Sequence, residues 1–86
     1  MTQKSILLVG ASRGLGLAMA EDFVNRGWSV VGTVRGAKRT GLHDLQDRHG
    51  DAVEIAELDM TSVEDITALH DRLAGRHFDM LFVNAG

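Results

Sequence analysis

The chain has 86 residues, a formal net charge of −3, and acidic and basic residues interspersed along its length. This charge distribution gives no support for a nucleic-acid or membrane partner, and we expect neither. The lack of cysteine excludes disulfide bonds and thiolate chemistry. The first apolar run, residues 6–9, is too short for a signal peptide or a transmembrane helix. We therefore expect a cytoplasmic chain that forms one small domain or part of a larger one.

The first third of the chain predicts a strand, a helix and a second strand. Residues 5–9, which are apolar from residue 6 on, predict a buried strand. A helix is expected over about residues 13–26, because Gly16, Ala20 and Phe23 recur at helical spacing on one face. Gly27 should end that helix as a C-cap, and the valine-rich residues 28–34 predict the second strand.

The middle of the chain predicts a basic loop over residues 35–40, followed by a short helix over residues 42–49. Gly50 should stop this helix. Residues 53–58 predict the third strand, with Val53 and Ile55 on one face.

The last third predicts one more helix and one more strand. Thr61 and Glu64 have the spacing of a capping box, which predicts a helix that opens at Thr61. Gly75 should close that helix, and residues 78–83 predict the fourth strand. Behind the capping box runs an apolar stripe of Val63, Ile66, Leu69 and Leu73.

The resulting order is βαβαβαβ. Alternation of this kind predicts a parallel sheet with right-handed crossovers and helices on both faces. We therefore expect an α/β fold, namely part of a Rossmann-type doubly wound parallel sheet.

The stretch LLVGASRGLG, residues 7–16, fits two motifs that both lie between a strand and a helix. Gly10, Ser12 and Gly14 have the spacing of a serine hydrolase's nucleophile elbow. An elbow also needs an oxyanion donor from a loop after an earlier strand, and here the serine follows the first strand. Although Asp59 with His70 or His77 would formally complete a triad, the elbow is disfavoured.

The second motif, a glycine-rich turn that holds a dinucleotide phosphate, uses more of these residues. Gly10 allows a sharp turn out of the strand, Gly14 lets backbone approach the pyrophosphate, and Gly16 allows close packing of helix on sheet. The helix N-terminus then faces the phosphates with free N–H groups, and Ser12 becomes a hydrogen-bond donor. Met19 stands where the general fingerprint has its third glycine, so a turn without a ligand remains an alternative.

The end of the second predicted strand bears on which dinucleotide is bound. Folds that use NAD place an acid there, about 20 residues after the glycines, for the ribose 2′-hydroxyl. Here the sequence has Thr33, Val34 and Arg35, with Lys38 and Arg39 close behind. A guanidinium pairs with a 2′-phosphate, and Arg13 in the glycine turn adds a second one. This favours NADP(H) over NAD(H), with a solvated basic loop as the alternative.

Three motifs, each at the end of a predicted strand, follow one another along the chain. Together they resemble the motifs of the short-chain dehydrogenase/reductase family over the whole chain. VGASRGLG resembles the family's Thr-Gly-x-x-x-Gly-x-Gly motif, with Val9 in the threonine position. LDMT resembles its adenine-contacting segment, and VNAG resembles Asn-Asn-Ala-Gly, with Val83 replacing the first asparagine. The residues that the resemblance assigns to the cofactor are Gly10, Ser12, Arg13, Gly14, Leu15, Gly16, Arg35, Asp59, Met60, Asn84, Ala85 and Gly86.

The resemblance also implies individual roles for these residues. Asp59 would accept a hydrogen bond from the adenine amino group, and Met60 would lie beside the ring. Asn84 would tie the central strands, and the following Ala85-Gly86 would pass under the ribose. Asp59 could instead simply cap the helix near Thr61, and Asn84 could be a strand-end turn former.

Members of this family reduce carbonyls or oxidise alcohols by hydride transfer, with a serine, a Tyr-x-x-x-Lys pair and a helix asparagine that all follow the Asn-Ala-Gly motif. No residue here matches that set, since the chain has no tyrosine and its only lysines are Lys4 and Lys38. We expect residues 1–86 to be the NADP(H)-binding half-domain, truncated before the catalytic region, with no reductase activity by itself. The complete protein would act on a small carbonyl or alcohol and would be a homo-oligomer.

The family's sheet continues beyond the fourth strand, so residues 80–83 should form an exposed edge that promotes self-association. A non-catalytic dinucleotide-binding module or a truncated remnant is the alternative function. A Rossmann methyltransferase is less favoured, because it usually has an acid at the end of the second strand. The spacing of the four histidines does not predict a metal site.

Overall fold

The computed structural model describes residues 3–84 and contains the predicted elements in the predicted order. The strands are β1 (Ser5–Val9), β2 (Ser29–Val34), β3 (Val53–Glu57) and β4 (Met80–Val83). The helices are α1 (Gly14–Asn25), α2 (Gly41–His49) and α3 (Val63–Leu73), with a 3-10 turn η1 (Gly50–Ala52) after α2. None of these helices within residues 3–84 is long and apolar enough to cross a membrane.

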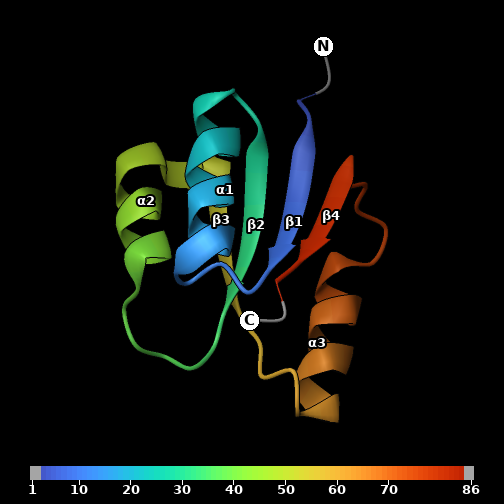
Figure 1. Ribbon diagram of the computed structural model, residues 1–86. Coiled ribbons are helices and arrows are strands. Elements are labelled where there is room, and N and C mark those ends of the chain that lie inside the picture. The colour runs from blue at the N-terminus through green and yellow to red at the C-terminus, as the bar shows by residue number, and fades with distance from the viewer. Residues whose placement is uncertain (1–2, 85–86) are drawn as a thin grey trace.

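The sheet is parallel, with the strand order β3-β2-β1-β4. Leu8 of β1 is in register with Gly32 of β2 and with Phe82 of β4. All four strands therefore end at the same edge of the sheet, which is the lower edge in Figure 1. This arrangement confirms the predicted Rossmann-type fold.

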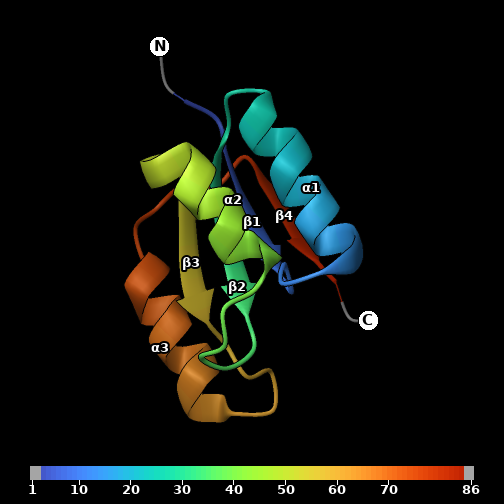
Figure 2. The ribbon, with the colours of Figure 1, turned by 90° about the vertical axis from the view of Figure 1, so that its left-hand side faces the viewer.

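The main hydrophobic core lies between the sheet and the helices α1 and α2, which cover one face together (Figure 2). Gly32 lets α2 approach closely, because a Cβ there would lie 2.6 Å from Leu42 Cδ2 and 3.1 Å from Ala11 Cβ. The buried core residues are Ile6, Leu8, Ala11, Ala20, Val24, Val30, Val34, Leu42, Leu45 and Val53.

Helix α1 ends as the sequence predicts. Gly27 follows the helix with φ of 88°, and its N–H donates to Val24 O at 3.1 Å. Trp28 N–H donates to Phe23 O at 3.0 Å, and the two rings meet edge to face with centroids 4.8 Å apart. These bonds form a Schellman motif with its usual hydrophobic contact.

Helix α3 lies alone on the other face of the sheet and is loosely packed (Figure 1). None of its residues is buried, and Val63 of the predicted apolar stripe is 74% exposed. Salt bridges hold its C-terminal end, where Arg72 and Arg76 pair with Glu54 of β3 at 3.0 and 3.1 Å. The periodicity was therefore sufficient to locate the helix but not to predict that its stripe is partly open to solvent.

The predicted capping box of α3 is wrong. The N-cap is Ser62, whose Oγ accepts from Asp65 N–H at 3.2 Å. The hydroxyl of Thr61 instead donates to Asp59 Oδ1 at 2.6 Å. Because the nearby carboxylate accepts a hydrogen bond from this hydroxyl, Thr61 belongs to the loop before the helix.

Candidate functional site

A groove of about 540 Å³ lies at the edge where the strands end. Ligands of doubly wound sheets bind at this edge, outside the carboxyl ends of the strands. Segments that follow all four strands contribute to it. Its lining residues are Val9, Gly10, Ser12, Arg13, Thr33, Val34, Arg35, Leu58, Asp59, Met60, Thr61, Val83 and Asn84.

The turn from β1 into α1 depends on glycine at three positions. Gly10 has φ of 87°, a conformation that side-chain-bearing residues rarely adopt. A Cβ on Gly16 would lie 2.0 Å from Gly10 O, so only glycine allows α1 to start against this turn. Gly14 has φ of 61° and open space around its missing side chain. This space, next to the groove, fits the backbone approach that a bound pyrophosphate requires.

Thr33 of β2 fixes the glycine turn, a role that was not among the predictions from the sequence. Its Oγ1 accepts from Gly10 N–H at 2.8 Å, and its carbonyl accepts from Ala11 N–H at 2.8 Å. Thr33 is 2% exposed and is the buried polar residue of a strand otherwise rich in valine. The signal that could have identified it was a threonine inside the valine-rich part of the strand, next to its end, whereas the other hydroxyl residue, Ser29, starts the strand.

The start of α1 offers hydrogen-bond donors to the groove. The first N–H groups of a helix have no carbonyl of their own to bond, and they carry a partial positive charge. Ser12 and Arg13 line the groove beside this helix end, and none of the lining residues is a histidine that could activate Ser12. This geometry suits an anion such as a phosphate and gives the hydrolase alternative no support. Leu15 is 59% exposed and is not among the lining residues.

The basic side chains of the loop after β2 lie in different surroundings. Arg35 lines the groove and makes no salt bridge within residues 3–84. Arg39 instead pairs with two carboxylates of α2, Asp44 at 3.0 Å and Asp47. Lys38 is exposed and does not line the groove. Arg35 and Arg13 are therefore the arginines that the structure brings to the groove.

Asp59 lies in the groove and also organises its own loop. Its Oδ1 accepts from Thr61 N–H at 2.9 Å and from the Thr61 hydroxyl at 2.6 Å. These hydrogen bonds, with the positive charge of Arg35, lower the pKa of Asp59 below its usual value. The Asp59 carboxylate thus bonds to Thr61 in the loop before α3, whose N-cap is Ser62, so it does not cap the helix itself, and it lines the groove. Met60 beside it is 57% exposed and also lines the groove.

Asn84 connects β4 to the glycine turn at the fourth side of the groove. Its N–H donates to Val9 O at 2.8 Å, and its side-chain Nδ2 donates to Gly10 O at 3.4 Å. A Cβ on Gly10 would lie 2.8 Å from Asn84 O, so the two strand ends are in close contact. Ala85 and Gly86, the last two expected cofactor residues, lie outside the described residues.

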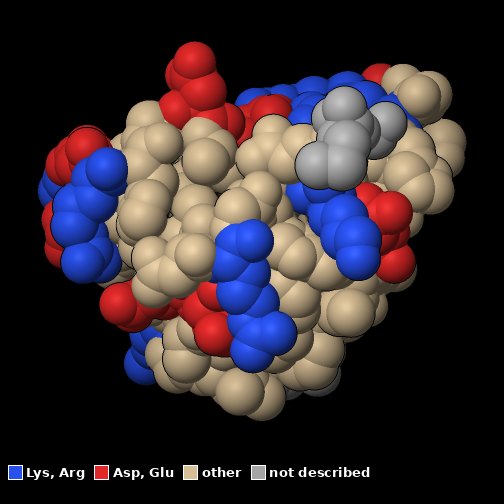
Figure 3. Space-filling model, turned by 90° about the horizontal axis from the view of Figure 1, so that it is seen from above, with Lys and Arg blue, Asp and Glu red and all other residues tan. Residues whose placement is uncertain are grey.

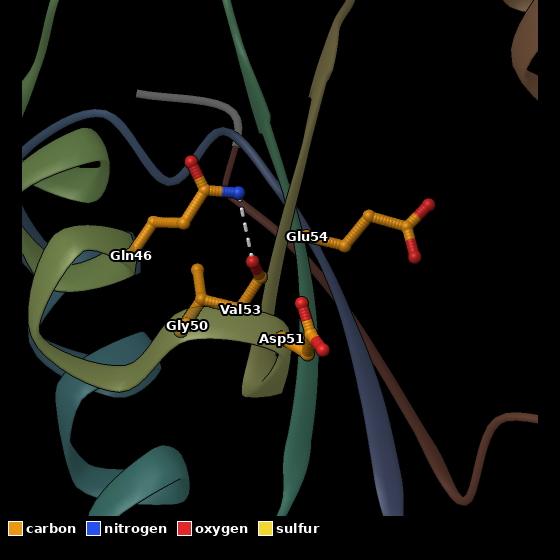
Figure 4. A pocket seen from close by; sticks show the side chains of 5 residues that line it. All are labelled: Gln46, Gly50, Asp51, Val53 and Glu54. Atoms are coloured by element: carbon orange, nitrogen blue, oxygen red, sulfur yellow. Dashed lines mark hydrogen bonds between the residues drawn. The ribbon is translucent and has the colours of Figure 1, made fainter.

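A second hollow, of about 500 Å³, lies at the start of β3 and is lined by Gln46, Gly50, Asp51, Val53 and Glu54. Figure 4 shows that Gln46 reaches toward the strand from one side, whereas Glu54 points away from it on the other side. The Gln46 amide is bonded to Val53 O at 3.0 Å, and Glu54 is paired with arginines of the α3 end. Its polar groups therefore do not converge on a common point, and this hollow is the weaker candidate.

The opposite end of the sheet shows no gathering of one kind of charge. Figure 3 views the end of the molecule from which the strands start, and there acidic and basic side chains are interspersed among uncharged ones. Across residues 3–84, no three His, Cys, Asp or Glu side chains gather closely enough to hold a metal ion.

Comparison with known proteins identifies the family. The short chain dehydrogenase family model matches residues 4–86. A serine 3-dehydrogenase of Rhizobium radiobacter is 40% identical over 95% of this chain and 33% of its own length. The fold and sequence together place this chain in the short-chain dehydrogenase family, whose members use a nicotinamide dinucleotide.

Two solved structures of relatives contain a cofactor. A putative short-chain dehydrogenase/reductase from Burkholderia multivorans with bound NADP has 58% identity and a TM-score of 0.93, over 99% of this chain and 37% of that one. A carbonyl reductase from Pseudomonas aeruginosa in complex with NADP has 34% identity and a TM-score of 0.89, over 98% and 39%. The chain thus spans little more than a third of these relatives.

Proposed function

We propose that residues 1–86 are the NADP(H)-binding half-domain of a short-chain oxidoreductase that reduces a small carbonyl compound or oxidises an alcohol. The observation that carries the proposal is the position of Arg35, which lines the groove at the end of β2 where an NAD-binding protein has an acid. The NADP in two related structures supports the same choice.

Each side of the groove has a role in this proposal. The glycine turn and the N–H groups of α1 bind the pyrophosphate, with Ser12 as a further donor. The guanidinium groups of Arg35 and Arg13 pair with the 2′-phosphate, where a carboxylate would repel it. Asp59 accepts from the adenine amino group while Met60 covers the ring.

The remaining side of the groove belongs to the nicotinamide end of the cofactor. Asn84 holds the ends of β1 and β4 together, and the resemblance to the family assigns the next two residues, Ala85 and Gly86, to the ribose. When bound, the cofactor supplies or accepts the hydride. The groups that move the proton are proposed to lie in further sequence of the protein. We place the complete protein in the cytoplasm, as a homo-oligomer.

The test is oxidation of NADPH and of NADH by the intact protein against a panel of ketones and aldehydes. The proposal expects carbonyl-dependent oxidation that is faster with NADPH. Tight cofactor binding without turnover on any carbonyl or alcohol would instead identify a non-catalytic dinucleotide-binding module.

A further inference from the structure

The loop between β3 and α3 holds Asp59 by its backbone as well as by its side chain. Asp59 N–H donates to Asp65 Oδ2 at 3.0 Å, and Asp65 is fixed in turn because its N–H donates to Ser62 Oγ at 3.2 Å. The position of the Asp59 backbone is therefore tied to the first turn of α3.

The two oxygens of the Asp59 carboxylate have different surroundings. Oδ1 accepts two hydrogen bonds from Thr61, at 2.9 Å from the backbone N–H and 2.6 Å from the hydroxyl. Oδ2 accepts no hydrogen bond from any residue in the range 3–84. The torsion that turns a carboxylate is broad, so the partners of the oxygens decide how the group is oriented.

We infer that Thr61 is a positioning residue for adenine recognition. Its hydroxyl holds Oδ1 against the loop, so that Oδ2 is the oxygen left to accept from an amino group in the groove. The inference rests on the proposed function, and it adds a residue that does not itself need to touch the cofactor.

The same hydrogen bonds keep Asp59 apart from the neighbouring cation. Arg35 is close enough to influence the titration of Asp59, yet the two form no salt bridge in the described part of the chain. With Oδ1 already bonded to Thr61, the carboxylate is a poorer partner for a guanidinium, which needs both oxygens for a bidentate pair. The acid thus serves the adenine amino group, and the arginine stays available for the 2′-phosphate.

The experiment compares the binding of NADPH with that of its hypoxanthine analogue, in which the adenine amino group is replaced by a carbonyl oxygen. Dissociation constants are measured by fluorescence titration of the intact protein. The wild type is expected to bind NADPH about tenfold tighter, because the analogue loses a charge-assisted hydrogen bond and places an acceptor against a carboxylate.

Thr61→Val removes the hydroxyl and should reduce this preference by about threefold or more, mainly through weaker binding of NADPH. Thr61→Ser keeps the hydroxyl and should retain the preference. Thr67→Val makes the same chemical change at an exposed position of α3 and is the matched control.

An unchanged preference in Thr61→Val, or an equal loss of affinity for both ligands, would overturn the inference and leave Thr61 a merely structural role. Equal binding of both ligands by the wild type would also overturn it, because the amino group would then not be recognised. A wild type that binds neither ligand would refute the proposed function itself. Since Thr61 is exposed, Thr61→Val is expected to fold, and its thermal unfolding curve verifies this.

Discussion

At the scale of single residues, the site is built on contacts that allow almost no substitution. Gly16 and Thr33 are the clearest cases, because one must lack a side chain and the other must supply a hydroxyl. Both act on the same feature, the turn at Gly10 that carries the chain from β1 into α1. The consequences of changing either one can therefore be measured in both stability and cofactor binding.

Gly16→Ala should displace the start of α1, since the new Cβ would lie 2.0 Å from Gly10 O and backbone would have to move. We expect a loss of about 2–4 kcal/mol in stability and much weaker cofactor binding. Thermal unfolding and cofactor titration measure the two effects. Gly75→Ala is the control for backbone strain alone. Gly75 has φ of 80°, so alanine is strained there, but the new Cβ would have open space around it. A Gly16→Ala protein as stable as this control would refute the packing argument.

Thr33→Val should leave Gly10 N–H without its acceptor while preserving the shape of the side chain. The expected cost is about 1–3 kcal/mol in the free energy of unfolding, because the Gly10 N–H remains unpaired in a partly buried place. Chemical denaturation measures it, with the exposed Thr67→Val as the matched change. Equal stability of the two variants would show that the hydroxyl does not hold the turn.

At the scale of elements, the sequence predicted the strands and helices well. Each has its own hydrophobic pattern, and residues such as glycine mark where it ends. Gly27, for example, ends α1 with the positive φ that the pattern implied. The glycine turn could be located in the same way, because few other residues could make it.

The features that the sequence did not predict depend on hydrogen-bond partners. These partners are either distant in the sequence or one of several that fit the spacing equally well. Thr33 and Thr61 are polar residues whose acceptors and donors become known only when the chain folds. A capping box was expected at Thr61 because its spacing to Glu64 fits, and the competing carboxylate of Asp59 decided otherwise. Likewise, the apolar stripe of α3 indicates which face of the helix is apolar, but it does not indicate which residues bury that face.

Strand β4 forms an edge of the sheet among the described residues, with Leu81 and Val83 61% and 51% exposed. An apolar edge with unpaired backbone groups pairs readily with other chains. We therefore predict that a protein consisting of residues 1–86 alone self-associates in sedimentation experiments. Leu81→Lys should reduce this association, whereas Leu15→Lys, at an exposed position of α1, should not. A monomer at high concentration would contradict the prediction.

At the scale of the whole molecule, several carboxylates join elements that are far apart in the sequence. Asp79 accepts from Ser5 N–H at 2.8 Å, and this bond and the nearby His77 lower its pKa. Glu54 similarly joins β3 to the α3 end, and its pKa is lowered chiefly by its hydrogen bond to Arg76. The negative form of each group is thus favoured in the folded state.

This gives a prediction for acid stability. A carboxylate with a lowered pKa in the folded state contributes stability above its unfolded pKa of about 4, and the contribution is lost as the pH falls through the folded value. We expect the thermal unfolding temperature to fall as the pH decreases below about 4, and Asp79→Asn to lessen that fall. The asparagine can still accept from Ser5 N–H but does not titrate in this range. An identical pH dependence in the variant would exclude Asp79 as a contributor.

The central claim is that this groove binds NADP(H) through Arg35, and the most direct measurement is the ratio of dissociation constants for NADH and NADPH. We predict that the intact protein binds NADPH at least about tenfold more tightly, because a guanidinium–phosphate pair is gained. Arg35→Ser should remove most of that difference while leaving the affinity for NADH nearly unchanged. Equal affinities in the wild type, or a ratio that does not respond to Arg35→Ser, would contradict the account.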